Sequence, residues 1–139
     1  MDGMKDLETL IKSMSPELSE ENFVFVSCPS KSLPSDLSPI CLFQEEEGTT
    51  LICRANEAKQ LSLSYTGVWK RITLRVHSAL DAVGFLNEIT AALAEAGISC
   101  NVVSAYYHDH LFVPELDAEK AMNTLRVLSQ RHPNPTPRD

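Results

Sequence analysis

The order of hydrophobic periodicities between positions 71 and 131 is the feature that most constrains the fold of this chain. Residues 71–76 alternate charged or hydroxyl side chains with apolar ones, which is typical of a half-buried strand. From about Asp81 to Ala96 the apolar residues have helical spacing, and Gly97 follows as a left-handed helix stop. Further strands are predicted at 98–105 and 111–113. A last helix is predicted at 117–131, with a buried stripe of Ala118, Ala121, Met122, Leu125 and Leu128.

The first half of the chain contains the same kinds of element in a shorter form. Residues 29–39 hold three prolines and four serines, which excludes a helix interior and predicts a loop. Residues 23–27 followed by Cys28 parallel residues 72–76 followed by His77, so we interpret the chain as two related modules, the first of them abbreviated. Strands are predicted at 23–28, 40–44 and 49–53, and short helices at 5–14 and 56–63.

These patterns divide the chain into a first module at 1–67, a second module at 68–131 and a tail. Residues 132–139 contain three prolines among eight residues and are predicted to be disordered. A strand-helix-strand-strand-helix unit needs a fourth strand to complete an antiparallel sheet with both helices on one face, but no strand follows the last helix. We therefore expect residues 23–28 to supply that strand, so that both modules share one continuous sheet.

Charge and composition restrict the partners of the chain. The net charge is -7 and the 12 basic residues are scattered, whereas nucleic acid or an anionic membrane surface requires clustered Lys and Arg. No apolar run approaches the roughly 20 residues that span a bilayer. The first ten residues lack the apolar core of a secretory signal, so we expect a cytoplasmic protein. The four cysteines show no CxxC spacing, which favours reduced core thiols over disulfides or zinc ligands.

One candidate binding element is the loop between the strand at 71–76 and the helix that follows it. The start of a helix carries unpaired backbone N–H groups and the positive end of the helix dipole, which together suit a carboxylate. Gly84 lacks a Cβ and would let a ligand approach the backbone, although tight helix-to-strand packing is an alternative reason for this glycine. Ser78 and Asp81 are spaced like a helix-capping pair, and capping is the alternative role for both.

A second candidate is the segment His108-Asp109-His110. On a strand the two histidines would share a face and could chelate zinc, but no third ligand is evident. Asp109 could pair with the ammonium group of a ligand, which would complete a zwitterion site beside a helix start. Its alternative role is that of a turn residue that bonds its own backbone. The five glycines stand apart and no GxSxG motif occurs, so we expect neither an enzyme nor a cofactor.

Residues 72–114, ITLRVHSALDAVGFLNEITAALAEAGISCNVVSAYYHDHLFVP, resemble an ACT domain. The motif VHSALDAVG and the ending HDHLFVP are similar to those of small bacterial two-module ACT proteins. They also resemble the ACT modules of the CASTOR-type arginine sensors, whose last module carries DH followed two residues later by VP. The resemblance is strong over residues 69–128. It is weaker over residues 4–60, where it depends on the FVFV strand and the EEEG turn.

The resemblance implies a ferredoxin-like α+β fold of tandem ACT modules, with an antiparallel sheet and helices on one face. It also implies that an amino acid or similar metabolite binds between modules. The arginine sensors carry an acidic residue two positions before the loop glycine, where this chain has Ala82, so arginine is not specified. By position, the implied ligand-binding residues are Ser78, Ala79, Leu80, Asp81, Val83 and Gly84 in the loop, Asn101 and Val102 on the facing strand, and Asp109.

We therefore expect a regulatory protein that binds a small molecule, catalyses no reaction, and forms a homodimer or a complex with a regulatory partner protein. The alternative is a protein-interaction or oligomerisation module without a functional ligand pocket. A small enzyme or metal protein that uses His108, Asp109 and His110 is a third reading of the same residues.

Overall fold

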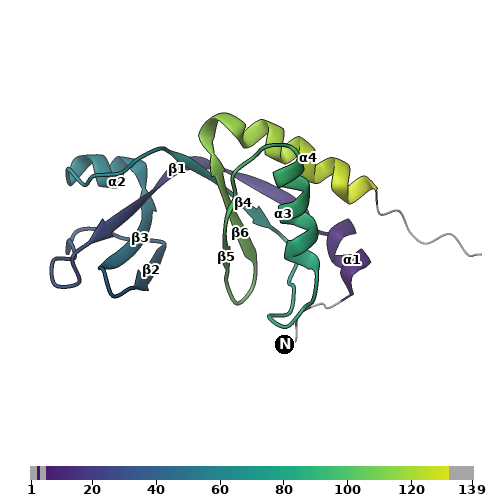
Figure 1. Cartoon of the computed structure of the whole chain (residues 1–139), viewed down its shortest axis with the longest axis horizontal. Coiled ribbons are helices and arrows are strands. Elements are labelled where there is room, and N and C mark those ends of the chain that lie inside the picture. Colours follow the sequence, from purple (N-terminus) through teal and green to yellow (C-terminus); the bar gives the residue numbers. More distant parts are fainter. Residues whose placement is uncertain (1–2, 4–5, 132–139) are drawn as a thin grey trace, which may run out of the picture.

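The computed structural model describes Gly3 and residues 6–131, so the tail predicted at 132–139 lies outside the described residues. Figure 1 shows an elongated molecule in which helices lie along a curved sheet. The helices are α1 (Leu7–Lys12), α2 (Ala55–Gln60), α3 (Phe85–Glu95) and α4 (Ala118–Gln130), with a 3-10 turn at Glu115–Asp117 before α4. The strands are β1 (Pro16–Cys28), β2 (Cys41–Gln44), β3 (Thr49–Arg54), β4 (Trp69–Leu74), β5 (Asn101–Ser104) and β6 (Asp109–Pro114).

The strands form a single sheet in the order β2-β3-β1-β4-β6-β5, and every neighbouring pair is antiparallel. Val24 and Cys53 pack with α2, whereas Ile72 and Leu111 pack with α3 and α4. Strand alternation and the cross-strand pairing place these four side chains on the same face of the sheet. The expected α+β architecture, an antiparallel sheet with helices on one face, is confirmed (Figure 1).

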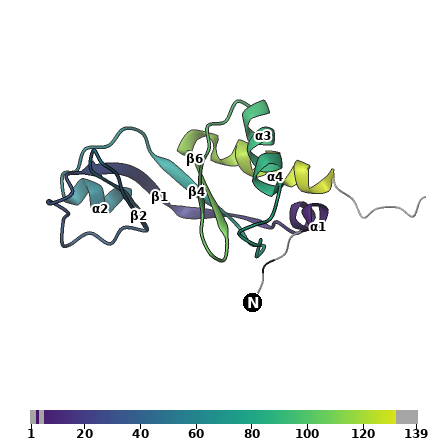
Figure 2. The same ribbon diagram turned by 60° about the horizontal axis from the view of Figure 1, so that its bottom comes forward.

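β1 is the strand that joins the two halves of the chain. Its first part pairs with β4, where Leu18 lies opposite Ile72, and its last part pairs with β3, where Val24 lies opposite Cys53. Figure 2 shows β1 crossing from one half of the molecule to the other. The two halves do share a sheet, but the predicted strand at 23–28 is too short, and it is the segment at 16–23 that pairs with the second half.

The first part of β1, with the sequence PELSEEN, does not look like a buried strand. Most of its side chains are half-buried or exposed, and its pairing with β4 contains a register shift. Ion pairs connect it to other strands, from Glu17 to Arg75 at 2.8 Å and from Glu21 to Arg54 at 2.5 Å. Exposed ion pairs contribute little to stability, so the backbone hydrogen bonds of the sheet are the main constraint on this segment.

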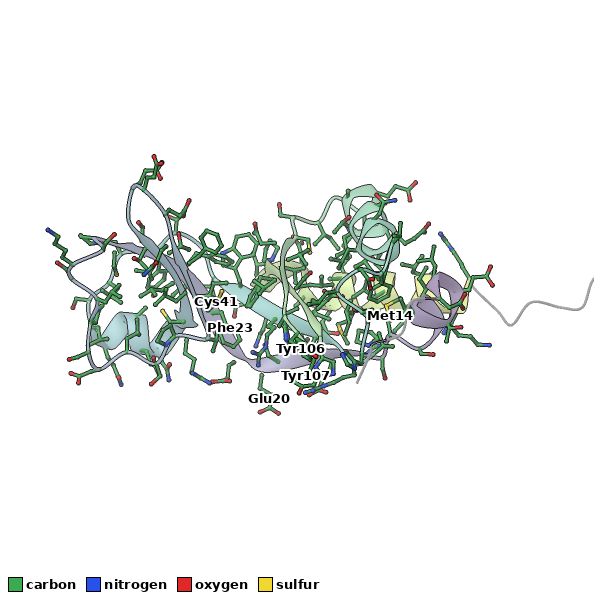
Figure 3. All side chains as sticks on the ribbon, turned by 90° about the horizontal axis from the view of Figure 1, so that it is seen from below. Met14, Glu20, Phe23, Cys41, Tyr106 and Tyr107 are labelled. Atoms are coloured by element: carbon green, nitrogen blue, oxygen red, sulfur yellow. The ribbon has the colours of Figure 1, made fainter. Side chains whose placement is uncertain are left out.

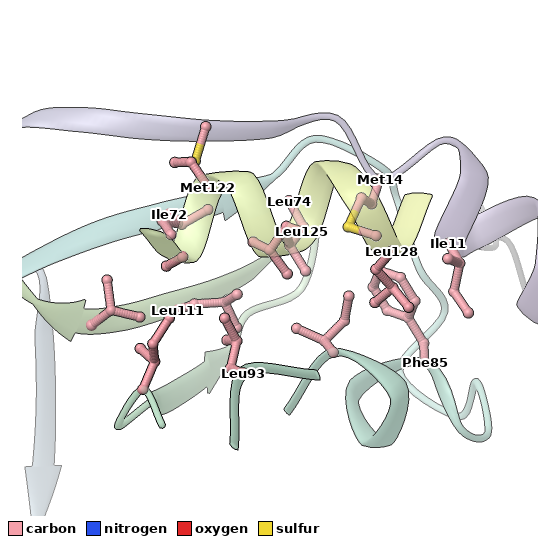
Figure 4. Close-up of a cluster of buried hydrophobic side chains, with 14 of the residues drawn as sticks. Ile11, Met14, Ile72, Leu74, Phe85, Leu93, Leu111, Met122, Leu125 and Leu128 are labelled. Atoms are coloured by element: carbon pink, nitrogen blue, oxygen red, sulfur yellow. The ribbon is translucent and has the colours of Figure 1, made fainter. Parts of the chain in front are cut away.

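The larger core lies between the sheet and the helices α1, α3 and α4. Leu93 of α3, Leu125 of α4 and Leu111 of β6 are completely buried there, and Figure 4 shows side chains from helices and strands meeting in this core. Asp117 lies at the N-cap position of α4, but its side chain makes no capping hydrogen bond. The predicted buried stripe of the last helix is confirmed and consists of Ala118, Ala121, Met122, Leu125 and Leu128.

We call the opposite side of the sheet, which carries Phe23, Arg71 and Phe112, the open face. The rings of Phe23 and Phe112 are buried and meet edge to face with their centroids 5.8 Å apart. Phe25 lies 5.8 Å from Phe112 and 5.6 Å from Trp69. Figure 3 shows Phe23 close to the junction of the two halves. These rings bury one another at the point where β1 changes partners.

Replacing Phe23 by alanine should destabilise the whole chain, because the substitution leaves a cavity where the two halves join. The expected loss in the free energy of unfolding is about 3–5 kcal/mol. Phe43, on the edge strand β2, is 66% exposed, and Phe43→Ala should change stability by no more than about 0.5 kcal/mol. Urea unfolding followed by circular dichroism measures both variants. Two separate transitions in the native protein would contradict the shared-sheet explanation.

Candidate functional site

The start of α3 lies at the end of the predicted binding loop. The helix begins at Phe85, later than the predicted start at Asp81, and Gly84 is its N-cap residue with a left-handed φ of 89°. That conformation favours glycine. The N-cap residue is Gly84 instead of Ser78 or Asp81, and no side chain among the described residues is hydrogen-bonded to this end of the helix, so the interpretation of Ser78 and Asp81 as a capping pair is wrong. The first N–H groups of α3 are therefore left for water or a ligand.

Ser78 and Asp109 form a buried polar pair between the loop and the hairpin. The Ser78 hydroxyl donates to Asp109 Oδ2 at 3.0 Å, and the two residues are only 8% and 6% exposed. Asp109 is the first residue of β6 and lies opposite Ser104, so it belongs to the strand rather than to the turn. The pair connects two segments that are 31 positions apart in the sequence.

A small pocket of about 60 Å³ lies beside this pair. Phe85 and Leu86 contribute the start of α3 to its wall, and Asp109 contributes a carboxylate. The pocket thus brings together a helix start and an acidic group, the two features singled out in the sequence. Its lining residues are Ser78, Ala79, Leu80, Ala82, Phe85, Leu86, Ser104, Ala105 and Asp109.

The remaining implied ligand residues lie elsewhere. Val83 is 83% exposed, and Asp81 and Gly84 are in the loop but do not line the pocket. Val102 packs against the core beneath the helices. Asn101 alternates with it and therefore points from the open face, two strands away from Arg71. Ser104 and Ala105 take the places that the resemblance implied for Asn101 and Val102.

The N-terminal part of the chain forms a further wall of this region. Gly3 packs directly on the loop, since a Cβ on Gly3 would lie 2.5 Å from the backbone nitrogen of Ala79. A side-chain carbon of Leu7 in α1 lies 3.5 Å from where a Cβ of Gly84 would stand. That distance is an ordinary van der Waals contact, so the left-handed backbone and not crowding is the reason for glycine at position 84. The N-terminal segment therefore packs against the loop and against the start of α3.

Ser104 and Ala105 could have been found from the hairpin itself. In a short antiparallel hairpin, the residues nearest the turn lie opposite one another, so Asp109 predicts a partner near position 104. The Ser78 contact could not be found in this way, because it depends on how the loop folds back over the sheet.

His108 and His110 do not form a metal site with Asp109. Asp109 faces the helices, whereas His110 is on the open face and makes a 2.9 Å hydrogen bond through Nδ1 with the Thr73 hydroxyl. Burial lowers the pKa of His110, and the nearby positive charge of Arg71 lowers it further. Among the described residues, no group of three or more His, Cys, Asp or Glu side chains could hold a metal ion.

The cysteines are all free thiols. Cys28 and Cys53 are buried, and Cys41 and Cys100 are half-buried. Burial raises the pKa of Cys100 to about 11, so its thiol is protonated and unreactive near neutral pH. In the part of the chain that the structure describes, no helix is long and apolar enough to cross a bilayer.

Exposed apolar and aromatic side chains lie on the two segments that line the pocket, the loop before α3 and the β5–β6 hairpin. Tyr106 and Tyr107, at the tip of the β5–β6 hairpin, have ring centroids 5.0 Å apart, and the His77 ring lies 5.5 Å from that of Tyr107. Figure 3 shows the two tyrosines side by side. Leu80 and Val83 of the loop are also largely exposed. A large exposed apolar patch is typical of a surface that meets another molecule.

Comparison with known proteins identifies the family. One ACT-domain family profile matches residues 2–70 and a second matches residues 68–127. Together they account for nearly all of the described chain. The chain is a tandem ACT-domain protein. The ferredoxin-like ACT fold implied by the sequence is therefore confirmed, and so is the presence of two ACT modules. No curated protein sequence matches the chain.

Solved structures of other proteins have the same fold. A Vibrio cholerae protein of unknown function, described as a possible transport protein, is 43% identical over 91% of this chain and 98% of its own, with a TM-score of 0.80. An Agrobacterium tumefaciens protein is 19% identical over 82% and 87% of the two chains, with a TM-score of 0.70. The regulatory subunit of Thermus thermophilus aspartate kinase is 8% identical over 84% and 97%, with a TM-score of 0.63. The last two similarities concern the fold alone.

Ser78→Ala should destabilise the protein, because it removes the hydroxyl that donates a hydrogen bond to a buried carboxylate. The expected loss in the free energy of unfolding is about 1–3 kcal/mol. Ser104→Ala is the matched control, since Ser104 lines the same pocket but is exposed, and it should have little effect. Thermal and urea unfolding measure both variants, and equal losses would contradict a specific role for the Ser78–Asp109 hydrogen bond.

Proposed function

We propose that this ACT protein is a cytoplasmic regulatory protein that binds an amino acid in the pocket beside Ser78 and Asp109. The observation that carries the proposal is the meeting of an uncapped helix start and a buried carboxylate at one pocket. A ligand carboxylate fits the N–H groups of α3, and a ligand ammonium group fits Asp109. This arrangement is complementary to the two charged groups that every amino acid carries.

The size and lining of the pocket favour a small ligand. Its volume of about 60 Å³ is well below the roughly 300–1,000 Å³ of ordinary ligand sites. Ala82 lines the pocket at the position where the arginine sensors have an acidic residue. This position therefore offers no negative charge to a guanidinium group. A small neutral amino acid is therefore a better candidate than arginine.

The relatives agree with a regulatory role. The structure from Thermus thermophilus is a regulatory subunit of aspartate kinase, as is that from Thermus flavus. We infer from the shared fold that this protein, too, reports a metabolite to another protein. The exposed patch of Leu80, Val83, Tyr106 and Tyr107 next to the pocket is a suitable surface for that partner or for a second copy of the chain.

The second candidate function is a protein-interaction module that needs no ligand. The same exposed patch favours it, because the patch would bind a partner whether or not the pocket were filled. The two functions differ in their response to amino acids. A ligand-dependent module changes stability when its amino acid is added, whereas an interaction module does not.

A thermal-shift panel of the common amino acids at millimolar concentration tests the proposal. A ligand at 100 times its Kd stabilises the native state by about 2.7 kcal/mol, which raises the melting temperature of a chain of this size by several degrees. Asp109→Asn should abolish the shift, because the amide can still accept from Ser78 but has no charge for the ammonium group. Asp36→Asn, an exposed loop substitution, should retain it. If no amino acid shifts the native protein, the proposal is wrong and the interaction module is favoured.

A further inference from the structure

Three arginines project from the open face, and one of them differs from the other two. Arg54 and Arg75 each pair with a glutamate of β1, at 2.5 Å and 2.8 Å. Arg71 has no carboxylate partner among the described residues, and its Nε is buried without a hydrogen-bond partner. A buried guanidinium nitrogen without an acceptor is costly, and arginine has no neutral form at ordinary pH. The site therefore lacks an anionic acceptor.

The guanidinium of Arg71 is fixed in position. Its central carbon lies 5.0 Å from the centre of the Phe23 ring, and that ring is completely buried. The backbone N–H of Arg71 donates to the Ser19 hydroxyl at 3.1 Å, which holds β4 against β1 at this point. A cation that is already stacked and immobilised loses little entropy when it binds an anion, so Arg71 is prepared for one.

The surroundings of Arg71 favour an anion. Arg71 lies opposite Phe112 on β6, and His110, two residues before Phe112, lies on the same face. Burial lowers the pKa of His110, and the charges of Arg71 and Arg75 lower it further against the opposing charge of Asp109, so His110 lies within reach of the charge of Arg71. The nearby carboxylate of Glu17 is already engaged by Arg75.

We propose that Arg71 anchors a second binding site, on the open face, for the carboxylate or phosphate group of a small anionic metabolite. The guanidinium offers two parallel N–H donors to such a group. His110 and the exposed amide of Asn101, on the strands that follow, are the neighbouring polar groups. This site is separate from the pocket beside Asp109, because the sheet lies between them.

Isothermal titration with inorganic phosphate and with acetate, at constant ionic strength, tests this site and distinguishes the two kinds of anion. Arg71→Gln should weaken binding of the preferred anion by about tenfold or more, because it removes the charge and the paired donors. Arg54→Gln is the matched control on the same face and should bind the anion as the native protein does. Arg71→Lys keeps the charge but lacks the planar pair of donors, so its affinity for the anion should lie between those of the native protein and Arg71→Gln.

Nuclear magnetic resonance provides a readout that does not depend on affinity. A bound anion should raise the pKa of His110, because negative charge stabilises the imidazolium, and amide shifts should cluster on β4 and β6. Asp109→Asn should leave this response unchanged, so failure of the amino-acid pocket and failure of this site are distinguishable. Equal weakening in Arg71→Gln and Arg54→Gln would overturn the proposal in favour of general screening. So would the absence of any His110 response in the native protein. Dissociation of a native dimer by Arg71→Gln would show instead that a second copy supplies the missing carboxylate.

Discussion

The pairing of one strand with both halves of the sheet is the constraint on which the rest of this structure depends. The last residues of β1 pair with β3, and its first residues pair with β4. A six-stranded sheet results, in which neither half has a free central edge. Since an unpaired edge strand is a site of aggregation, the shared strand protects both modules at once. It also forces the helices of both halves onto the same face.

The same strand determines where the candidate pocket lies. Pro16 begins β1 opposite Leu74 near the end of β4, and the backbone N–H of Arg75 donates to Ser15 at 3.3 Å. This contact brings α1, which directly precedes β1, next to the loop that follows β4. Leu7 can then pack on Gly84 at the start of α3. The N-terminal segment thus meets the loop and the start of α3 because one strand pairs across the module boundary.

The elements that could be predicted from the sequence are those whose buried positions require apolar residues at a regular spacing. The buried stripe of α4 was predicted because a helix face that packs on a core requires apolar residues at helical spacing. The left-handed Gly97 after α3 was predicted because a positive φ favours glycine. The first part of β1 was missed, because its polar residues are held by backbone pairing and ion pairs instead of by packing. The start of α3 was placed too early because the apolar spacing of the helix continues back into the loop at Ala82 and Val83.

The candidate site could be predicted only in part for a similar reason. Asp109 and the loop were chosen correctly as neighbours, and the hydrogen bond from Ser78 brings them together. Asn101 was selected by position in a resemblance, but a strand sends adjacent residues to opposite faces, and Asn101 points away from the pocket. Predicting which of two neighbours faces a ligand requires the register of the hairpin, and a one-residue error in register reverses the answer.

Asp109 and His110 are adjacent on β6, but their side chains lie in two different electrostatic environments on opposite faces of the sheet. Asp109 lies on the helix side with a hydroxyl donor from Ser78, and His110 lies on the open face, where arginines lower its pKa. The net charge of -7 is a sum over the whole chain, so it does not describe the local charge on either face of the sheet. Because the two residues are adjacent on β6, the strand places them on opposite faces of the sheet, and each face has its own chemistry.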